Sequence, residues 1–180
     1  MIRRWSIGMV LALFVCTGVG CGPVRMNISV SLDKSFQQKY GTNKELLVDL
    51  VGVKGAENAN WEQRSMTEYW SEDASTKVKH RDPSLPGLKT LTLNSKSLDP
   101  QTISVSDALW EQWLGGASCS DNPQIFVLAQ LPGTWDKSDD KAGNLDPRRR
   151  ILSACPKGHG MFDPPPTIHL VIGVQGMSIQ

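Results

Sequence analysis

The sequence predicts a mainly β protein, an immunoglobulin-like β-sandwich of about seven short strands with one or two short helical insertions. Two patterns indicate this fold: apolar and polar residues alternate through several short segments, and turn-forming residues separate those segments. The 180 residues include 16 Gly and 11 Pro, which favours many turns over long helices. Short strands at this spacing are typical of two packed sheets.

The strand pattern is strongest at the two ends of the mature chain. Near the start, one apolar set alternates with polar residues, as in a half-buried strand: Val24, Met26, Ile28, Val30 and Leu32. Near the end, a second set alternates in the same way: Ile168, Leu170, Ile172 and Val174. Gln175-Gly176 then predicts a turn into a last short strand at 177–179.

The remaining strands are expected in the middle of the chain. Segment 45–53 is apolar on both faces apart from Asp49 and Gly52, so it is predicted to be a central strand. Weaker alternation or short apolar runs predict four more strands, at 88–93, 102–106, 125–130 and 150–154. The polar stretch 133–150 between them is predicted to be an exposed loop.

Two segments have a helical composition, 60–71 and 106–114. The second begins at the potential cap Ser106, presents Trp110 and Trp113 on one face and ends at Gly115-Gly116. Large aromatic residues usually pack in a core, and we interpret the Trp pair in that way. The alternative is that Trp110, Trp113 and Trp135 form a surface that binds glycan or another ligand.

The first twenty residues are typical of an export signal. Arg3 and Arg4 precede an apolar run at 7–15, which is followed by small residues, and the run is shorter than a bilayer span. We therefore expect two regions, a signal peptide at 1–20 and a single domain at 21–180.

Segment Gly18-Val19-Gly20-Cys21 resembles the lipobox of bacterial lipoproteins. The resemblance implies that Cys21 is acylated and becomes the first residue of the mature protein. Several acyl chains would then anchor it stably to a membrane. Gly rather than Asp at position 22 implies, by the same resemblance, sorting to the outer membrane, with the domain on its periplasmic face.

If Cys16 is removed and Cys21 is lipidated, Cys119 and Cys155 are left. Two cysteines in an oxidising compartment predict one disulfide. The alternative is a metal site that uses Cys155 and His159, but two further ligands at suitable spacing are missing from the sequence.

Charge and motifs favour neither nucleic-acid binding nor catalysis. Lys and Arg total 19 against 18 Asp and Glu, so the concentrated positive charge of a nucleic-acid binder is missing. No nucleophile, nucleotide or metalloprotease motif stands out, and the three His lie far apart. We predict a protein that is not an enzyme and needs no cofactor or metal.

The acidic loop 136–146 has oxygen ligands at the first, third and fifth positions of an EF-hand-like pattern, namely Asp136, Ser138 and Asp140. It lacks the Gly at the sixth position and has Pro147 where a bidentate Glu belongs, so an exposed acidic loop is favoured over a calcium site. The basic run 148–150 is interpreted as a solvated strand edge balanced by these acids. The alternative is contact with lipid headgroups or cell wall.

The order of these features resembles that of the small outer-membrane lipoprotein of type VI secretion systems. The closest local matches are Glu62-Gln63 with segment 68–74, and the ending 168–179. The resemblance implies a transthyretin-like β-sandwich. It also implies a non-catalytic role in which the lipoprotein tethers the periplasmic domain of a large inner-membrane protein to the outer membrane.

In that family the loop between the first two strands contributes to binding the inner-membrane partner. The corresponding stretch here is 34–44, with these candidate contacts: Phe36, Gln37, Gln38, Lys39 and Tyr40. An exposed aromatic side chain on a firmly held loop suits an interface. The alternative is that Phe36 or Tyr40 covers the end of the sandwich core.

Overall fold

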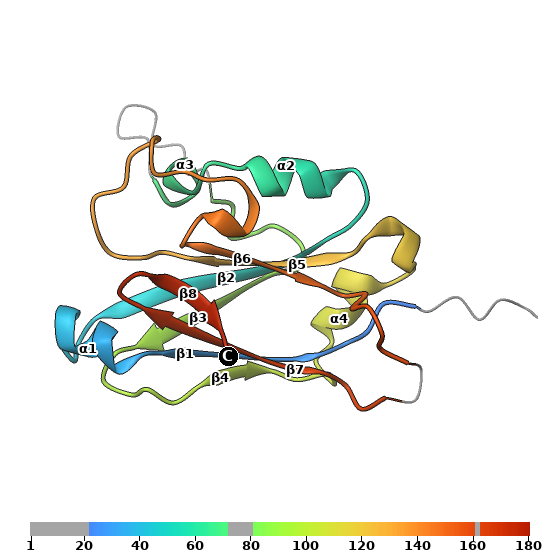
Figure 1. Cartoon of the computed structure of the whole chain (residues 1–180), viewed down its shortest axis with the longest axis horizontal. Helices are drawn as coiled ribbons and strands as arrows, with labels where there is room; N and C mark the ends of the chain where they lie inside the picture. The colour runs from blue at the N-terminus through green and yellow to red at the C-terminus, as the bar shows by residue number, and fades with distance from the viewer. Residues whose placement is uncertain (1–21, 72–80, 161–162) are drawn as a thin grey trace, which may run out of the picture.

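The computed structural model describes residues 22–71, 81–160 and 163–180, and in them two four-stranded sheets pack face to face (Figure 1). The first sheet has the order β4 (Gln101–Ile103), β1 (Asn27–Leu32), β7 (Thr167–Gly173) and β8 (Gly176–Ile179). The second has the order β3 (Leu88–Asn94), β2 (Glu45–Val53), β5 (Gln124–Ala129) and β6 (Arg149–Ser153). The predicted β-sandwich with helical insertions is confirmed.

The first and last segments of the domain lie side by side in the first sheet. β1 and β7 pair in parallel, and every other strand pair in the two sheets is antiparallel. The register places Val30 opposite Leu170 and Leu32 opposite Ile172. Because side chains alternate between the faces of a strand, most of both predicted apolar sets packs in the core between the sheets: Met26, Ile28, Val30 and Leu32 of the first, and Ile168, Leu170 and Ile172 of the second. Val24 and Val174 lie outside the two strands and are only half-buried.

β2 is a central strand, as predicted, and both of its faces are covered. Leu46, Val48 and Leu50 pack into the core between the sheets, whereas Val51 and Val53 pack on the opposite face. That outer face is covered by α2 (Glu57–Gln63) and α3 (Met66–Trp70) (Figure 1). A strand buried on both faces lacks polar alternation, which explains its continuous apolar sequence.

The helix predicted at 60–71 is in fact two helices. The chain becomes extended at Arg64 (φ −60°, ψ 129°), so α2 ends there. Ser65 then caps α3, because its hydroxyl accepts a hydrogen bond from the Glu68 amide at 3.0 Å. A Ser cap satisfies a free amide at the start of a helix, and it restarts the helix with a different axis.

The predicted helix at 106–114 is shorter than expected, and Ser106 does not cap it. α4 spans Leu109–Leu114, and Asp107, not Ser106, accepts a hydrogen bond from the Leu109 amide at 3.0 Å. β4 is also shorter than the predicted strand at 102–106, because the chain turns after Ile103, where the Asp107 amide bonds to the Ser104 carbonyl at 2.9 Å.

Trp110 and Trp113 of α4 are buried in the main core with their rings in a T-shaped contact, the centroids 5.1 Å apart. Each indole N–H donates to a backbone carbonyl, that of Trp110 to Ser104 and that of Trp113 to Gly87. The packing interpretation of this pair is confirmed. Neither ring is available as a surface for sugar stacking.

A buried carboxylate joins α3 to the second sheet. Asp49, on the outer face of β2, accepts hydrogen bonds from the Tyr69 hydroxyl at 2.8 Å, the Thr90 hydroxyl at 2.6 Å and the Arg81 guanidinium at 2.8 Å. Burial, together with the charge of Asp49, raises the pKa of Tyr69 above its ordinary value. Each of these hydrogen bonds pairs a lone pair of the Asp49 carboxylate, whose charge would otherwise be costly to bury.

Among the described residues, no helix is long and apolar enough to cross a lipid bilayer.

Candidate functional site

The stretch between β1 and β2, predicted to be a loop, begins with a short helix, α1 (Lys34–Tyr40). The Asp33 carboxylate caps it by accepting a hydrogen bond from the Ser35 amide at 2.7 Å. Hydrogen bonds from the side chain and backbone of Ser35 hold the pKa of Asp33 below its ordinary value. The helix ends at Gly41, whose positive φ of 83° suits a residue without a side chain.

Phe36 and Tyr40 cover one end of the core. Phe36 is 0% exposed, and its ring centroid lies 4.8 Å from that of Tyr40. The Tyr40 ring is half-buried, and its hydroxyl donates to the Pro132 carbonyl at 3.3 Å. Phe36 is therefore part of the core, as the alternative held, and it offers no exposed ring for a partner.

The exposed side chains at this end come from α1 and from the turn that follows it. Of the predicted contact residues, Gln38 and Lys39 are exposed, whereas Gln37 is half-buried and donates to the Ser95 carbonyl at 2.7 Å. Lys34 and Lys44 are exposed beside them. We call Lys34, Gln38, Lys39 and Lys44 the α1 surface, and its three Lys give it positive charge.

Ser95, which sequence reasoning missed, holds the turn after α1 in place. Its buried hydroxyl donates to the Gly41 carbonyl at 2.7 Å and accepts from the Lys44 amide at 2.9 Å. Its own amide donates to the Lys44 carbonyl at 2.9 Å. The backbone that carries the α1 surface is therefore held in one conformation, because Ser95 pairs the Gly41 carbonyl and both the amide and the carbonyl of Lys44.

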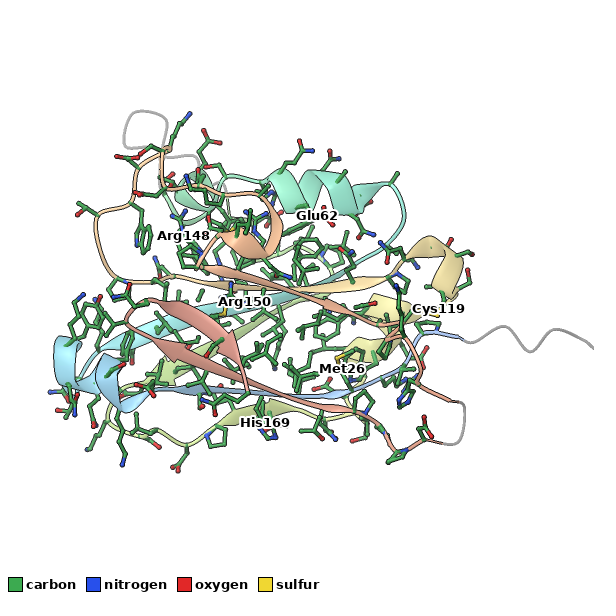
Figure 2. All side chains as sticks on the ribbon, viewed as in Figure 1. Met26, Glu62, Cys119, Arg148, Arg150 and His169 are labelled. Carbon is green, nitrogen blue, oxygen red and sulfur yellow. A yellow bond between two sulfur atoms is a disulfide. The ribbon has the colours of Figure 1, made fainter. Side chains whose placement is uncertain are left out.

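The start of the described chain lies at the opposite end of the sandwich from α1 (Figure 1). There the Val24 amide donates to the Ala154 carbonyl at 2.7 Å, so the chain joins the domain two residues after Gly22. Cys119 and Cys155 form a disulfide at the same end, with Cα atoms 5.7 Å apart (Figure 2). The Cys155 sulfur is therefore bonded to Cys119 and is not free to bind a metal, so the alternative of a metal site that uses Cys155 and His159 is wrong.

The predicted lipidation site Cys21 and the signal peptide at 1–20 lie outside the described residues. His80 also lies outside them. His169 is exposed on β7, and His159 has its Nδ1 atom 3.9 Å from Asp163 Oδ2. In the described ranges, no group of three or more His, Cys, Asp or Glu residues is arranged to hold a metal ion.

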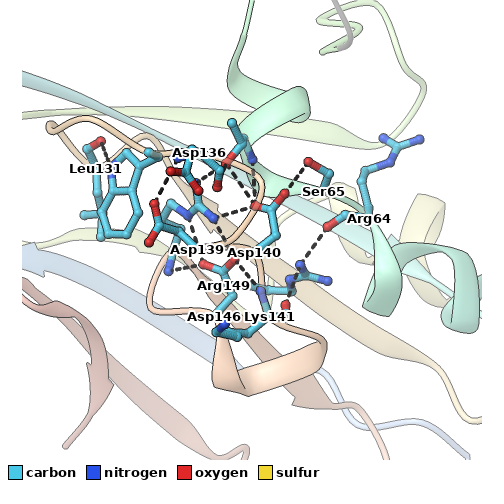
Figure 3. A network of polar contacts seen from close by, with 12 residues as sticks. Arg64, Ser65, Leu131, Asp136, Asp139, Asp140, Lys141, Asp146 and Arg149 are labelled. Carbon is cyan, nitrogen blue, oxygen red and sulfur yellow. Dashed lines mark hydrogen bonds and ion pairs between the residues drawn. The ribbon is translucent and has the colours of Figure 1, made fainter.

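The basic run 148–150, predicted to be a solvated strand edge, is instead largely buried. Arg148 is 2% exposed and forms ion pairs with Asp146 at 2.8 Å and Asp140 at 2.6 Å. Its guanidinium also lies 4.5 Å from the centre of the Trp135 ring. Figure 3 shows Asp136, Asp139, Asp140 and Asp146 of loop 136–146 close together. Of the residues considered as calcium ligands, Asp140 binds the Arg148 guanidinium, whereas Asp136 accepts a hydrogen bond from the Ser138 amide at 2.7 Å.

Arg149 is completely buried, and its two terminal guanidinium nitrogens bond to backbone oxygens in place of a carboxylate, whereas Nε has no hydrogen-bond partner. Its guanidinium donates to the carbonyls of Trp61 at 2.7 Å and Arg64 at 2.8 Å, and also to that of Glu62 (Figure 3 shows the bond to Arg64). These carbonyls lie at the C-terminal end of α2, where a cation is favourable. Burial lowers the pKa of Arg149.

Loop 133–150 is therefore only partly the exposed loop that the sequence predicts. Asp146 is fully buried, and the half-buried Trp135 donates its indole N–H to the Leu131 carbonyl at 3.0 Å. The loop joins α2 and α3 to the edge of the second sheet. With Trp110 and Trp113 buried and Trp135 stacked on Arg148, the three rings do not form the ligand surface of the alternative hypothesis.

We predict that Asp140 contributes to stability at neutral pH but not in acid. Burial raises its pKa, but hydrogen bonds from Ser65 and Thr67 outweigh this, so the pKa lies below the ordinary value of 3.8. A carboxylate with a depressed pKa stabilises the fold above its unfolded pKa and stops doing so as the pH falls through its folded pKa. Asp140→Asn should therefore destabilise at pH 7, and the difference from wild type should shrink below about pH 4.

Urea unfolding of both proteins at pH 7, 5 and 3 measures this effect. Asp99→Asn, at an exposed carboxylate after β3, is the matched control and should change stability little at any pH. A destabilisation by Asp140→Asn that is the same at pH 7 and pH 3 would contradict the prediction.

Comparison with known proteins gives structural similarities only, since no family model and no curated protein matches the sequence. Lip of Serratia marcescens, a membrane-bound component of the type VI secretion system, aligns with 88% of this chain and 96% of its own at 13% identity, with a TM-score of 0.46. The type VI secretion lipoprotein TssJ1 from Pseudomonas aeruginosa aligns with 88% of this chain and 95% of its own at 14% identity (TM-score 0.46).

A chain of a type VI membrane complex aligns with 86% of this chain and 96% of its own at 9% identity, with a TM-score of 0.47. The chain is thus similar to solved structures from the secretion system whose lipoprotein family its sequence resembles.

Proposed function

We propose that the mature protein is a non-catalytic lipoprotein, anchored through Cys21 to the periplasmic face of a bacterial outer membrane. Its α1 surface binds the periplasmic domain of a large inner-membrane protein of a secretion complex, and the lipoprotein tethers that protein to the outer membrane. The observation that carries the proposal is that the described chain begins at one end of the sandwich and α1 lies at the opposite end (Figure 1). We call the first of these the lipid-proximal end, because Cys21 directly precedes Gly22.

At the lipid-proximal end, little free chain separates the anchor from the domain. Gly22 and Pro23 lie between Cys21 and Val24, and the Val24 amide is bonded to Ala154. A lipid on Cys21 therefore keeps the sandwich close to the membrane surface. Each buried CH₂ of an acyl chain contributes about 0.8 kcal/mol to the anchoring, so several chains hold the protein stably.

At the far end, the α1 surface is suited to binding a protein. Its Lys side chains favour an acidic patch on the partner, and charge complementarity accelerates encounter and selects the partner. The backbone beneath is held by the buried Phe36 and by the hydrogen bonds of Ser95. A surface that is already ordered loses less entropy on binding.

The test is capture of the inner-membrane partner by the intact lipoprotein, purified from detergent-solubilised envelopes through a C-terminal tag. Reversing charge with Lys34→Glu and Lys39→Glu together should reduce the recovered partner by about tenfold or more, since a loss of about 1.4 kcal/mol corresponds to that factor. Both side chains are exposed, so the melting temperature should stay within a few degrees of wild type, about 2–4 °C.

Lys89→Glu, at an exposed lysine of β3, is the matched charge control and should capture the partner normally. Cys21→Ser should release the protein from the membrane fraction. Full capture by the double α1 variant would show that the partner binds elsewhere. Capture of cell-wall fragments without any inner-membrane protein would instead support a ligand-binding lipoprotein.

A further inference from the structure

The lipid-proximal end of the sandwich contains a cavity of about 740 Å³. This volume lies within the range of about 300–1,000 Å³ that is typical of small-molecule sites. The cavity opens between the first residues of the mature chain, the loop after β4 and the chain that connects β6 to β7. Figure 2 places Cys119, which lines it, beside the entering chain.

The wall of this cavity is mainly apolar. It is formed by Pro23, Val24, Val105, Pro156, Pro165 and the Cys119–Cys155 disulfide. Its charged residues already have partners: Arg25 is paired with Glu111, and Asp163 accepts a hydrogen bond from the Gly160 amide at 2.6 Å. The Arg25 and Asp163 side chains are also about half exposed. The lining therefore suits an uncharged, apolar occupant.

Gly22 is itself one of the lining residues. Cys21 directly precedes Gly22 in the sequence, so a single peptide bond joins the proposed lipidation site to a residue of the cavity wall. A group attached to Cys21 is held at a high effective concentration beside the cavity, whereas any free ligand has to reach it by diffusion. The position of the chain end thus favours an occupant covalently attached to Cys21.

We propose that this cavity holds one acyl chain of the lipid on Cys21 while the other chains insert into the membrane. The inference rests on the lipidation of Cys21 in the proposed function. A chain held in the cavity adds a second point of attachment to the short linker at Gly22 and Pro23. The sandwich is then oriented on the membrane, with the α1 surface directed away from it.

Photo-crosslinking of the full-length lipoprotein in its membrane tests the proposal. Cells grown with a diazirine-bearing fatty acid incorporate it at Cys21, and irradiation joins the chain to whatever it touches. Peptide mass spectrometry of the wild-type protein should find adducts on Val105 and on Pro156 or Pro165. Adducts confined to membrane lipids, or to residues 22–25, would overturn the proposal.

Val105→Trp, which places a larger side chain in the cavity, should reduce these adducts at least fivefold. The matched control is Val171→Trp, at a half-buried residue on the outer face of β7, which should leave them unchanged. Equal adduct yields in Val105→Trp and wild type would overturn the proposal, provided that the two proteins melt alike. If Val105→Trp does not fold, the positions of the adducts in the wild-type protein test the proposal without the variant.

Failure of the proposed function gives a different result. If the labelled fatty acid is not incorporated, or is still incorporated in Cys21→Ser, then Cys21 is not the lipid anchor, and the cavity proposal falls with it. If incorporation depends on Cys21 but no adduct forms in the cavity, the anchor stands and only the cavity proposal is overturned. A different apolar molecule that co-purifies in the cavity of the lipidated protein would also overturn it.

Discussion

Replacing Arg148 by Met is expected to lower the free energy of unfolding by about 3–5 kcal/mol, the range for breaking a buried ion pair by removing one partner. Arg148 donates to both carboxylate oxygens of Asp146, from Nε at 3.0 Å and from Nη2 at 2.8 Å. Asp146 is 0% exposed. Without Arg148, the buried Asp146 charge loses its ion-pair partner, and the contacts of Arg148 to Asp140 and Thr67 are lost as well.

Urea unfolding at pH 7 measures this loss, and Arg25→Met is the matched control. Arg25 also forms an ion pair, with Glu111, but its side chain is 45% exposed, so its removal should cost about 0–1 kcal/mol. In a double-mutant cycle, adding Asp146→Asn to Arg148→Met should cost less than the sum of the single changes, because the buried charge has been removed. Additive effects, or equal losses in Arg148→Met and Arg25→Met, would contradict this account.

Replacing Trp113 by Ala is expected to lower the free energy of unfolding by a similar amount, about 3–5 kcal/mol. The side chain is 1% exposed and packs across β2 at Gly52. A Cβ atom at Gly52 would lie 2.3 Å from Trp113 Cβ, so the position must be glycine for α4 to approach the sheet. Ala at 113 leaves a void and removes the indole bond to the Gly87 carbonyl.

Chemical denaturation measures the effect, and Trp135→Ala is the matched control because its ring is only half-buried. Trp113→Phe keeps most of the apolar volume and should lose less than Trp113→Ala. If Trp113→Ala kept wild-type stability but lost affinity for glycan fragments, the indole would serve a ligand and its role in packing would be refuted.

The strands were predictable because the pattern of apolar and polar residues that identifies a strand lies within the strand itself. Alternation with period two shows which side of a strand is buried, so β1 and β7 could be recognised from their own residues, and β2 was recognised as central because both of its faces are apolar. The short helices were harder. α1 has only seven residues, and so short a helix is decided by its cap at Asp33 and by the burial of Phe36, which no periodic pattern reveals.

The candidate site was predicted only in part, because some of its side chains have partners that are distant in the sequence and leave no local pattern. Gln38 and Lys39 are exposed where the resemblance placed partner contacts, but Phe36 is in the core and Gln37 is bonded to Ser95. Ser95 lies more than fifty residues beyond α1 in the sequence. A serine before a turn gives no local sign that its hydroxyl will hold a turn from a different part of the chain.

The sequence by itself determined the β-sandwich and the buried face of each main strand, because both follow from residue types at short spacing. It also determined the pair of cysteines that form the disulfide, because Cys119 and Cys155 are the two that remain after the export signal and the lipobox. Only the tertiary structure decided which charged side chains of segment 136–150 are buried and which are exposed. Arg149 is buried because Trp61 and Arg64, more than eighty residues earlier, supply carbonyl oxygens to its guanidinium. Arg148 pairs with the nearby Asp146 and Asp140, and Thr67, also more than eighty residues earlier, supplies a further oxygen. Burial of a charge depends on partners that meet only in the folded chain, so the local pattern of acids and arginines indicated a solvated loop.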